Sequence, residues 1–316
     1  MRRRVAIVRP TSGVWSGNET TARRWAGLLT ALGCEVELCD SEAVPDCELL
    51  VALHAVKSAA CVRAFKARHP GRPVVLALTG TDLYPSLSAR ALRTLSVVDR
   101  LIVLQPLAKK GLTAAFRRRT RVILQSAAAP RGTVAPCTRT FDVGVAAHLR
   151  AVKDPLRAAM AVRNLPASSR LRVLHVGAPL DERLAERARA ESVRNPRYRW
   201  LGERRPGAMH SFIRSCRLLV VTSVREGGPN VISEALAAGV PVVASRIDGN
   251  IGLLGRNYPG LVPPRDAKAL REVLLRAESE PGFLGRLQRE CAKLAPRFAP
   301  ERERMAWSRL LAELGL

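Results

Sequence analysis

The chain has 316 residues, 47% of them apolar, and this length suits two domains of ordinary size rather than one small core. Its formal net charge of +25 favours anionic partners, but the basic residues are spread along the whole chain, and no nucleic-acid-binding motif accompanies them. We interpret most of the excess charge as solvated surface and expect no nucleic-acid partner.

Apolar runs are short throughout the sequence. None approaches the roughly 18 residues that a membrane-spanning helix needs. The first run, Val5–Val8, is also shorter than the apolar core of a signal peptide, which takes about 7–15 residues. The seven cysteines are odd in number and lack metal-binding spacing, which is typical of small buried side chains in a reducing compartment. We therefore expect a cytoplasmic protein that does not bind a membrane.

In the first half, short β-branched runs alternate with longer amphipathic segments. This alternation predicts βαβ units and hence an α/β fold with a parallel sheet. The expected strands are residues 5–8, 35–39, 48–53, 73–78, 100–104 and 121–124. Helical patterns lie between them, such as 19–32, 55–68 and 107–117.

A stretch rich in Ala, Pro, Thr and Gly, residues 125–140, has no apolar periodicity and predicts a linker. The alternation then restarts. Strands are expected at 141–146, 171–176, 198–202, 217–222 and 240–245, and helices near 154–163, at 180–193, from 230, and at 266–278, 281–294 and 300–314. We therefore predict a first Rossmann-like domain over 1–138, a second over 139–298, and a C-terminal helix, 299–316, that packs back on the first domain.

Ligands of doubly wound sheets bind at the carboxyl ends of the strands. In the first half, the loop SGVWSGN has two glycines that let backbone N–H groups approach a ligand, but it is not a dinucleotide motif. The TGTD stretch presents two hydroxyls and a carboxylate around a glycine. Each loop could equally be an ordinary turn. The strand-end positions are Thr11–Asn18, His54–Lys57, Thr79–Asp82, Gln105, Ala147–Lys153, Gly177 and Thr222–Asn230.

The stretch EGGPNVISEAL, from Glu226, places two carboxylates eight residues apart around a glycine-rich turn. A helix is expected from Asn230, and its free N–H groups suit a phosphate. If a nucleoside diphosphate binds there, Glu234 is placed to accept two ribose hydroxyls, and Glu226 to meet the group that the phosphates carry. The alternative is a capping carboxylate followed by a solvent-exposed helical Glu.

This stretch resembles the E-x7-E signature of the family-4 glycosyltransferases of GT-B fold. The resemblance extends over the whole chain, through the N-terminal glycine loop, TGTD, the basic loop HLRAVKDP and the final helix. It implies two doubly wound Rossmann-like domains facing a cleft, with the C-terminal helix crossing back. It also implies that Glu226 contacts the donor sugar and that Glu234 holds the ribose. The other residues implied in donor binding are Gly227, Gly228, Pro229, Asn230 and Val231.

The family's G-R-L-x-x-x-K element, which clamps the diphosphate, is matched here with departures by AHLRAVK. Lys153 falls on the family's Lys, His148 falls where Arg is usual, and Arg150 could supply the missing charge. The resemblance thus implies that Lys153, Arg150 and the helix dipole stabilise the departing UDP. The sequence has no D-x-D motif, so we expect a metal-independent enzyme that needs no cofactor, with the UDP-sugar as a co-substrate.

Within this family the chain is most similar to the selenosugar synthases of selenoneine biosynthesis, through VAIVRPTSGVWSGNETTARRW, LTGTDLY, HLRAVKDP and EGGPNVISEALAAGVPVVASRIDGNIGLLG. This resemblance implies that selenophosphate attacks the sugar of UDP-N-acetylglucosamine or UDP-glucose, giving a 1-seleno-sugar, UDP and phosphate. Its functional partners would be a selenophosphate synthetase and a downstream selenoneine synthase. Many family members have His where this chain has Thr79. Selenophosphate is already nucleophilic and needs no base to activate it, so the absence of this His would cost little. The residues expected to bind the acceptor are Gly17, Asn18, His54, Lys57, Thr79, Thr81 and Asp82.

Two alternatives remain open from the sequence. An ordinary family-4 transferase acting on a hydroxyl would need a base, for which Asp82 and His54 are the candidates. A degenerate transferase fold that only binds anions or nucleic acid would bind DNA in a salt-sensitive way and release no UDP.

Overall fold

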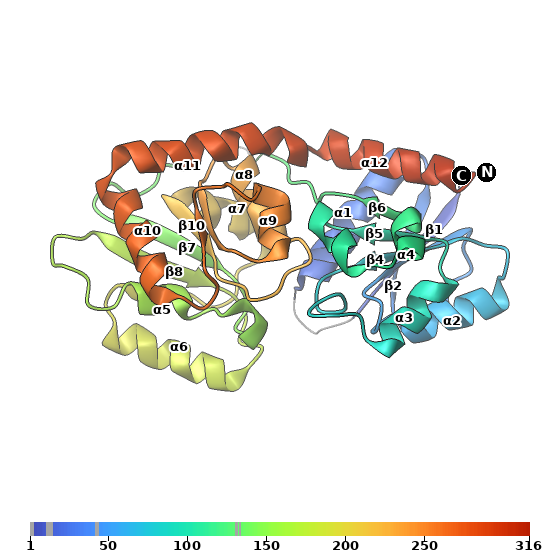
Figure 1. The fold of residues 1–316 in the computed structure, drawn as a ribbon, viewed down its shortest axis with the longest axis horizontal. Helices are drawn as coiled ribbons and strands as arrows, with labels where there is room; N and C mark the ends of the chain where they lie inside the picture. Colours follow the sequence, from blue (N-terminus) through green and yellow to red (C-terminus); the bar gives the residue numbers. More distant parts are fainter. Residues whose placement is uncertain (1–2, 11–14, 42–43, 130–131, 133) are drawn as a thin grey trace. The chain divides into compact units, whose positions relative to one another are not determined.

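The computed structural model describes residues 3–10, 15–41, 44–129, 132 and 134–316. It divides into two compact units: unit 1 is Met1–Ser126, Glu226–Asn230 and Ala299–Leu316, and unit 2 is Ala127–Arg225 and Val231–Phe298. Each unit contains one six-stranded sheet, and all strand pairs in both sheets are parallel (Figure 1). The predicted fold class, two doubly wound Rossmann-like sheets, is confirmed.

The units are divided differently from the predicted domains at two places. Unit 2 begins at Ala127, twelve residues before position 139, where we predicted the second domain to begin. The segment Glu226–Asn230 groups with unit 1, although the residues on both sides of it belong to unit 2. Periodicity could not show this, because the contacts of a five-residue loop leave no trace in an apolar pattern.

The sheet of unit 1 has the strand order β2-β1-β3-β4-β5-β6. All six of its strands lie at the predicted places, whereas α3 was not predicted and the expected helix 107–117 is split into η1 and α4. The elements are β1 (Arg4–Arg9), α1 (Gly17–Ala31), β2 (Glu35–Asp40), β3 (Leu49–Leu53), α2 (Ala59–Arg68), β4 (Val74–Leu78), α3 (Ala89–Val97), β5 (Arg100–Val103), η1 (Pro106–Gly111), α4 (Ala114–Arg119), β6 (Thr120–Val122) and α12 (Pro300–Glu313).

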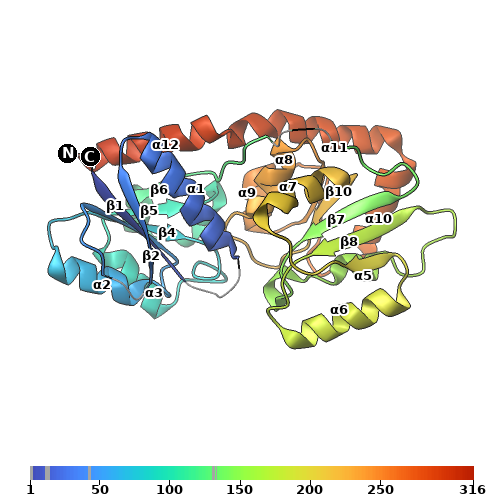
Figure 2. The same cartoon turned by 180° about the vertical axis from the view of Figure 1, so that it is seen from behind.

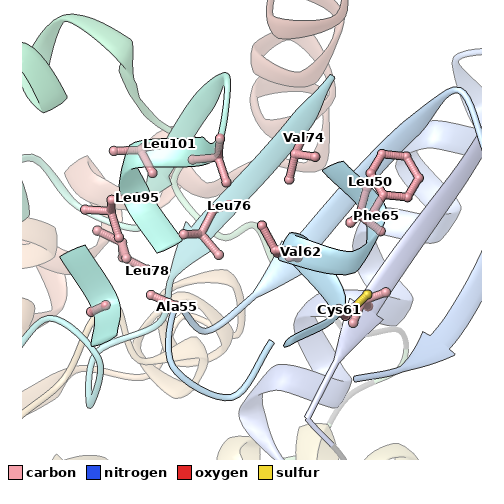
Figure 3. Close-up of a cluster of buried hydrophobic side chains, with 14 of the residues drawn as sticks. Leu50, Ala55, Cys61, Val62, Phe65, Val74, Leu76, Leu78, Leu95 and Leu101 are labelled. Atoms are coloured by element: carbon pink, nitrogen blue, oxygen red, sulfur yellow. The ribbon is translucent and has the colours of Figure 1, made fainter. Parts of the chain in front are cut away.

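Apolar clusters cover both faces of this sheet. Successive residues of a strand point to opposite faces, so neighbouring buried residues belong to different clusters. In β4, Leu76 belongs to one apolar cluster and its neighbour Val75 to the other. Phe65 of α2 and Leu95 of α3 complete the first cluster (Figure 3). Residues of α1 and α12 complete the second cluster, so the C-terminal helix supplies part of the core of unit 1.

Helix α12 carries a buried carboxylate, Glu303, whose side chain has no exposure to solvent. Its oxygens accept hydrogen bonds from Arg24 Nε (2.9 Å), Trp25 Nε1 (2.6 Å) and the backbone N–H of Ser126 (2.8 Å). Beside it, the rings of Trp25 and Trp307 meet edge to face, with their centroids 4.9 Å apart. The carboxylate therefore ties α12 to α1 and to the chain segment that follows β6.

We predict that Glu303→Ala destabilises the protein by about 3–5 kcal/mol, because it leaves a largely buried guanidinium and three further donors, one on Trp25 and two on Ser126, without their acceptor. Urea unfolding followed by tryptophan fluorescence measures this, since both Trp25 and Trp307 adjoin the carboxylate. Glu301→Ala, an exposed change in the first turn of the same helix, is the control and should cost at most about 1 kcal/mol. Equal losses in the two variants would contradict the role of Glu303.

The sheet of unit 2 has the order β12-β11-β10-β7-β8-β9, and Figure 2 shows β10, β7 and β8 side by side. The predicted strands are confirmed, whereas α7, α9 and β12 were not predicted and α5 is shorter than expected. The elements are β7 (Phe141–Ala146), η2 (Ala151–Lys153), α5 (Arg157–Ala161), β8 (Leu171–Val176), α6 (Glu182–Arg194), β9 (Tyr198–Trp200), α7 (Pro206–Ser215), β10 (Leu218–Val221), α8 (Asn230–Ala237), β11 (Val242–Ser245), α9 (Asp248–Leu254), β12 (Leu261–Val262), α10 (Ala267–Ser279), α11 (Pro281–Leu294) and η3 (Ala295–Phe298).

All seven cysteines are free, and six of them are buried, as small apolar side chains are. Within the described ranges, no helix combines the length and the apolar character that crossing a bilayer requires.

Candidate functional site

The first candidate loop of unit 2 leaves the carboxyl end of β7 and is fixed to the end of β8. The backbone N–H groups of Ala147 and Leu149 donate to the carbonyl oxygens of Val176 and Ala178, both at 2.9 Å. A Cβ at Gly177 would lie 1.9 Å from the carbonyl oxygen of Ala147, so only glycine allows this approach. Gly177, one of the predicted strand-end positions, thus permits the close packing of this loop.

Beneath the loop lies His175, which is completely buried. Its Nε2 is 2.7 Å from the carbonyl oxygen of Ala147, so Nε2–H donates there, and Nδ1 accepts from the Tyr198 hydroxyl at 2.8 Å. Burial, assisted by the nearby His148, lowers the pKa of His175 from 6.5 to about 4. A neutral imidazole therefore supports the loop at neutral pH. The sequence analysis missed this residue, because an isolated His in an apolar strand carries no motif.

The three predicted phosphate contacts, His148, Arg150 and Lys153, all lie on this loop. Nδ1 of His148 accepts the backbone N–H of Ala178 at 3.1 Å, so a neutral ring carries its proton on Nε2 and donates from there. Arg150 is exposed at the N-cap position of η2, and Lys153 is the last residue of η2. The loop thus brings several N–H donors together at one strand end, which suits an anion.

The far end of the loop is held by the residues that follow β10. The hydroxyl of Thr222 lies 3.1 Å from the carbonyl oxygen of Lys153 and 2.9 Å from that of Asp154, and donates to them. The backbone N–H of Val224 donates to the carbonyl oxygen of Val152 at 2.9 Å. Asp154 has a left-handed conformation, with φ 44°, and its carboxylate pairs with Arg157 at 2.8 Å. Both ends of the loop are therefore fixed within unit 2.

The second candidate element of unit 2 is helix α8, which carries Glu234. Ile232, Ser233 and Ala235 are buried under it, whereas Val231 and Glu234, three residues apart, are half-buried. Glu234 therefore lies on the face of α8 that is not packed into the core of unit 2. As predicted, Glu234 lies one turn into a helix that begins at Asn230.

In unit 1, the TGTD stretch forms a turn after β4 that is held by Asp82. One carboxylate oxygen accepts the N–H groups of Thr79 (3.0 Å) and Gly80 (2.9 Å), and the other accepts that of Ala55 (2.8 Å). Asp82 is only 3% exposed. Its carboxylate therefore fixes the turn. The expected roles of Asp82 as an acceptor contact and as a possible base stay predictions.

His54, at the end of β3, contacts the same turn. It has an unusual positive φ of 76°, and its Nδ1 accepts the backbone N–H groups of Val56 and Lys57 at 3.3 Å. A neutral ring therefore donates from Nε2 to the hydroxyl oxygen of Thr81, 3.0 Å away. The side chains of Thr81 and Lys57 are exposed at this strand end. The structure thus brings together four of the predicted acceptor residues, His54, Lys57, Thr79 and Thr81.

The remaining acceptor candidates, Gly17 and Asn18, begin α1. The hydroxyl of Ser16 caps this helix by accepting the N–H of Glu19 at 3.2 Å. The rest of the predicted glycine loop, Thr11–Val14, lies outside the described residues.

The Gly-Gly-Pro-Asn turn, part of unit 1 by its contacts, packs against the TGTD turn through its backbone. A Cβ at Gly80 would lie 2.5 Å from the backbone nitrogen of Gly227, and one at Gly227 would lie 2.5 Å from the carbonyl oxygen of Thr79. A Cβ at Gly228 would meet Leu104 Cβ at 2.7 Å. The glycines of the two sequence motifs are therefore required by contact with one another, which neither motif reveals by itself.

We predict that Gly80→Ala destabilises the contact between the two turns, because the residue has φ +129° and no space for a methyl group. The expected loss in the free energy of unfolding is about 1–3 kcal/mol. The control is Gly27→Ala in α1, where an added Cβ meets nothing within 4 Å and should stabilise the helix by about 0.5–1 kcal/mol. Urea unfolding compares the two, and an unchanged midpoint in Gly80→Ala would contradict the close packing.

We predict that His175 makes the protein less stable in acid. Its pKa is lowered to about 4 in the folded state from about 6.5 when unfolded, so the unfolded chain binds the proton first. The contribution of His175 to the free energy of unfolding is fully present above pH 6.5. It decreases as the pH drops from 6.5 towards 4, and it does not change further below pH 4. Through this group, the free energy of unfolding is about 3 kcal/mol higher above pH 6.5 than below pH 4. Unfolding at several pH values should show this slope in the parent and in His210→Gln, a control on α7, but not in His175→Gln.

Comparison with known proteins gives matches over part and over all of the chain. Residues 141–279 match the family model described as "Glycosyl transferases group 1". A "Putative teichuronic acid biosynthesis glycosyltransferase TuaC" of Bacillus subtilis (strain 168) is 36% identical over 72 residues, which are 23% of this chain and 18% of that relative. The matched stretch thus spans less than a fifth of the length of that relative.

Solved structures of similar fold cover the whole chain. Anabaena Alr3699/HepE, in a crystal structure with UDP-glucose, superposes with a TM-score of 0.81 at 18% identity, covering 99% of this chain and 100% of that one. Sucrose-phosphate synthase of Thermosynechococcus elongatus superposes with a TM-score of 0.78 at 18% identity, covering 99% of both chains. Residues 141–279 are therefore similar to the group 1 glycosyl transferases, and the whole chain has a GT-B fold.

Proposed function

We propose that this protein transfers a sugar from a UDP-sugar to a small anionic acceptor. The observation that carries the proposal is the rigid loop at the end of β7, which presents His148, Arg150 and Lys153 inside the matched glycosyltransferase domain. Such an arrangement suits the diphosphate of a nucleotide sugar, because fixed cations stabilise the charge that develops as UDP departs. The similar fold of HepE, solved with UDP-glucose, supports UDP-glucose as a donor, and UDP-N-acetylglucosamine is the other candidate.

Each proposed donor contact has a separate chemical task. Lys153 and Arg150 would neutralise the leaving UDP, with His148 donating from Nε2. Glu234 on α8 would accept the two ribose hydroxyls, and Glu226 would contact the transferred sugar. The proposal requires no metal ion for UDP departure, because cationic side chains take that part.

For the acceptor we propose selenophosphate, on the sequence resemblance to selenosugar synthases and on the polar groups at the strand ends of unit 1. Lys57 supplies a cation there, and Thr81, whose oxygen accepts from His54, can donate its own hydroxyl proton to an anion. Selenium would form the new bond to the anomeric carbon while the bond from that carbon to the UDP oxygen breaks. Water would then cleave the selenium–phosphorus bond, releasing phosphate and the 1-seleno-sugar. A selenophosphate synthetase would supply the acceptor and a selenoneine synthase would consume the product.

The test is UDP release from UDP-glucose and from UDP-N-acetylglucosamine, with and without selenophosphate, followed by mass analysis of the sugar product. Release that depends on selenophosphate, with a selenium-containing sugar, supports the full proposal. Release with sugar alcohols instead would retain a UDP-sugar transferase but overturn the acceptor. Salt-sensitive DNA binding without UDP release from any acceptor would overturn the enzyme itself.

We predict that Glu234→Gln and Glu226→Gln separate binding from turnover. Glu234→Gln should weaken UDP binding by about 1–3 kcal/mol, because a neutral amide accepts more weakly than a carboxylate. Glu226→Gln should instead lower turnover and leave the affinity for free UDP nearly unchanged. Calorimetric titration with UDP and steady-state kinetics measure both, with the exposed Glu186→Gln on α6 as the control. Equal losses of UDP affinity in the two variants would contradict this division of roles.

A further inference from the structure

We infer that Arg24 of α1, held by Glu303 of the C-terminal helix, is a positioning residue for the turn Gly227–Asn230. This inference rests on the proposed function, in which that turn contacts the donor. Arg24 lies in the stretch VAIVRPTSGVWSGNETTARRW, but neither it nor Glu303 was predicted to have a role.

The guanidinium of Arg24 bridges two groups far apart in the sequence. Its Nε donates to Glu303 at 2.9 Å, and its Nη1 donates to the side-chain oxygen of Asn230 at 3.0 Å. The Arg24 side chain is 17% exposed, and that of Glu303 is fully buried, so this charged pair is only weakly screened by solvent. The orientation of Arg24 is thus fixed from the side of α12 before it reaches the turn.

The turn has few side chains through which it can be held. Gly227 and Gly228 have none, and Asn230 supplies the amide that contacts α1. The nitrogen of that amide donates to the carbonyl oxygen of Gly17 at 3.3 Å, while its oxygen accepts from Arg24. Arg24 therefore acts on the Asn230 side chain, which connects the end of the turn to α1.

Gln125 adds a second connection between Arg24 and the turn. In the orientation that gives both ends of its amide a partner, the nitrogen donates to the carbonyl oxygen of Gly228 at 2.5 Å, and the oxygen accepts from Arg24 Nη2 at 3.1 Å. All three guanidinium nitrogens of Arg24 are then used. A planar fork with several donors can serve these three acceptors together, and a lysine cannot.

Two measurements on the full-length protein test this inference, one without and one with a substrate. Hydrogen–deuterium exchange followed by mass spectrometry, without ligand, reports the opening of peptides that cover Gly227–Glu234. In Arg24→Ala we expect exchange there to be about tenfold faster relative to the strands of unit 1, which also lose the ion pair of Glu303, with little change in the strands of unit 2. The rate of UDP release from the UDP-sugar should fall by about tenfold or more, because the turn would no longer hold the donor in the reactive position.

Two further variants serve as controls. Arg23→Ala removes the neighbouring arginine of α1, which pairs with Glu19 rather than with the turn, and should leave both measurements unchanged. Arg24→Lys can pair with Glu303 but cannot also reach Asn230 and Gln125. It should therefore restore thermal stability more than it restores turnover.

The outcomes distinguish this inference from the proposed function. Unchanged exchange of the turn in Arg24→Ala overturns the inference, and so does faster exchange spread evenly over the whole chain, which would mark a merely structural residue. Faster local exchange with normal turnover would also overturn it. If the parent releases no UDP with any acceptor, the proposed function fails, while the ligand-free exchange still decides whether Arg24 holds the turn.

Discussion

The buried carboxylate of Glu303 is the interaction on which the arrangement of unit 1 depends. A fully buried charge is tolerated only with enough donors around it, and here α1 and the segment after β6 provide them. The C-terminal helix is thereby fixed on the second face of the sheet, next to Trp25. The same arginine that satisfies Glu303 also contacts Asn230, so one charge organises both the core and a candidate site.

Unit 2 uses a different means to fix its candidate loop. The backbone of the loop is held from below by His175 and from the far end by Thr222. A neutral imidazole and a hydroxyl bind these carbonyl oxygens without adding a charge beside the basic loop. The positive charge of the loop is carried by Arg150 and Lys153.

Several residues that look catalytic in the sequence have local structural tasks. Asp82 uses both oxygens to hold the TGTD turn, and Gly80 and Gly227 allow two backbones to meet. These findings narrow the acceptor candidates to side chains that are exposed at the strand ends, above all Lys57 and Thr81. A motif thus indicates candidate places in the chain, while the contacts show which of its residues have structural tasks.

The sequence by itself determined the alternation of strands and helices, the class of fold, and the positions of the strand-end loops. It could do so because burial on both faces of a parallel sheet produces continuous apolar strands such as 74–78, and these are visible without a structure. It did not give α3, α7 or α9, and it did not place Glu226–Asn230 with unit 1. Nor did it indicate Arg24, His175 or Glu303, each of which is defined by polar contacts to residues distant in the chain. Such contacts have no periodicity, and only the tertiary structure decides which donor meets which acceptor.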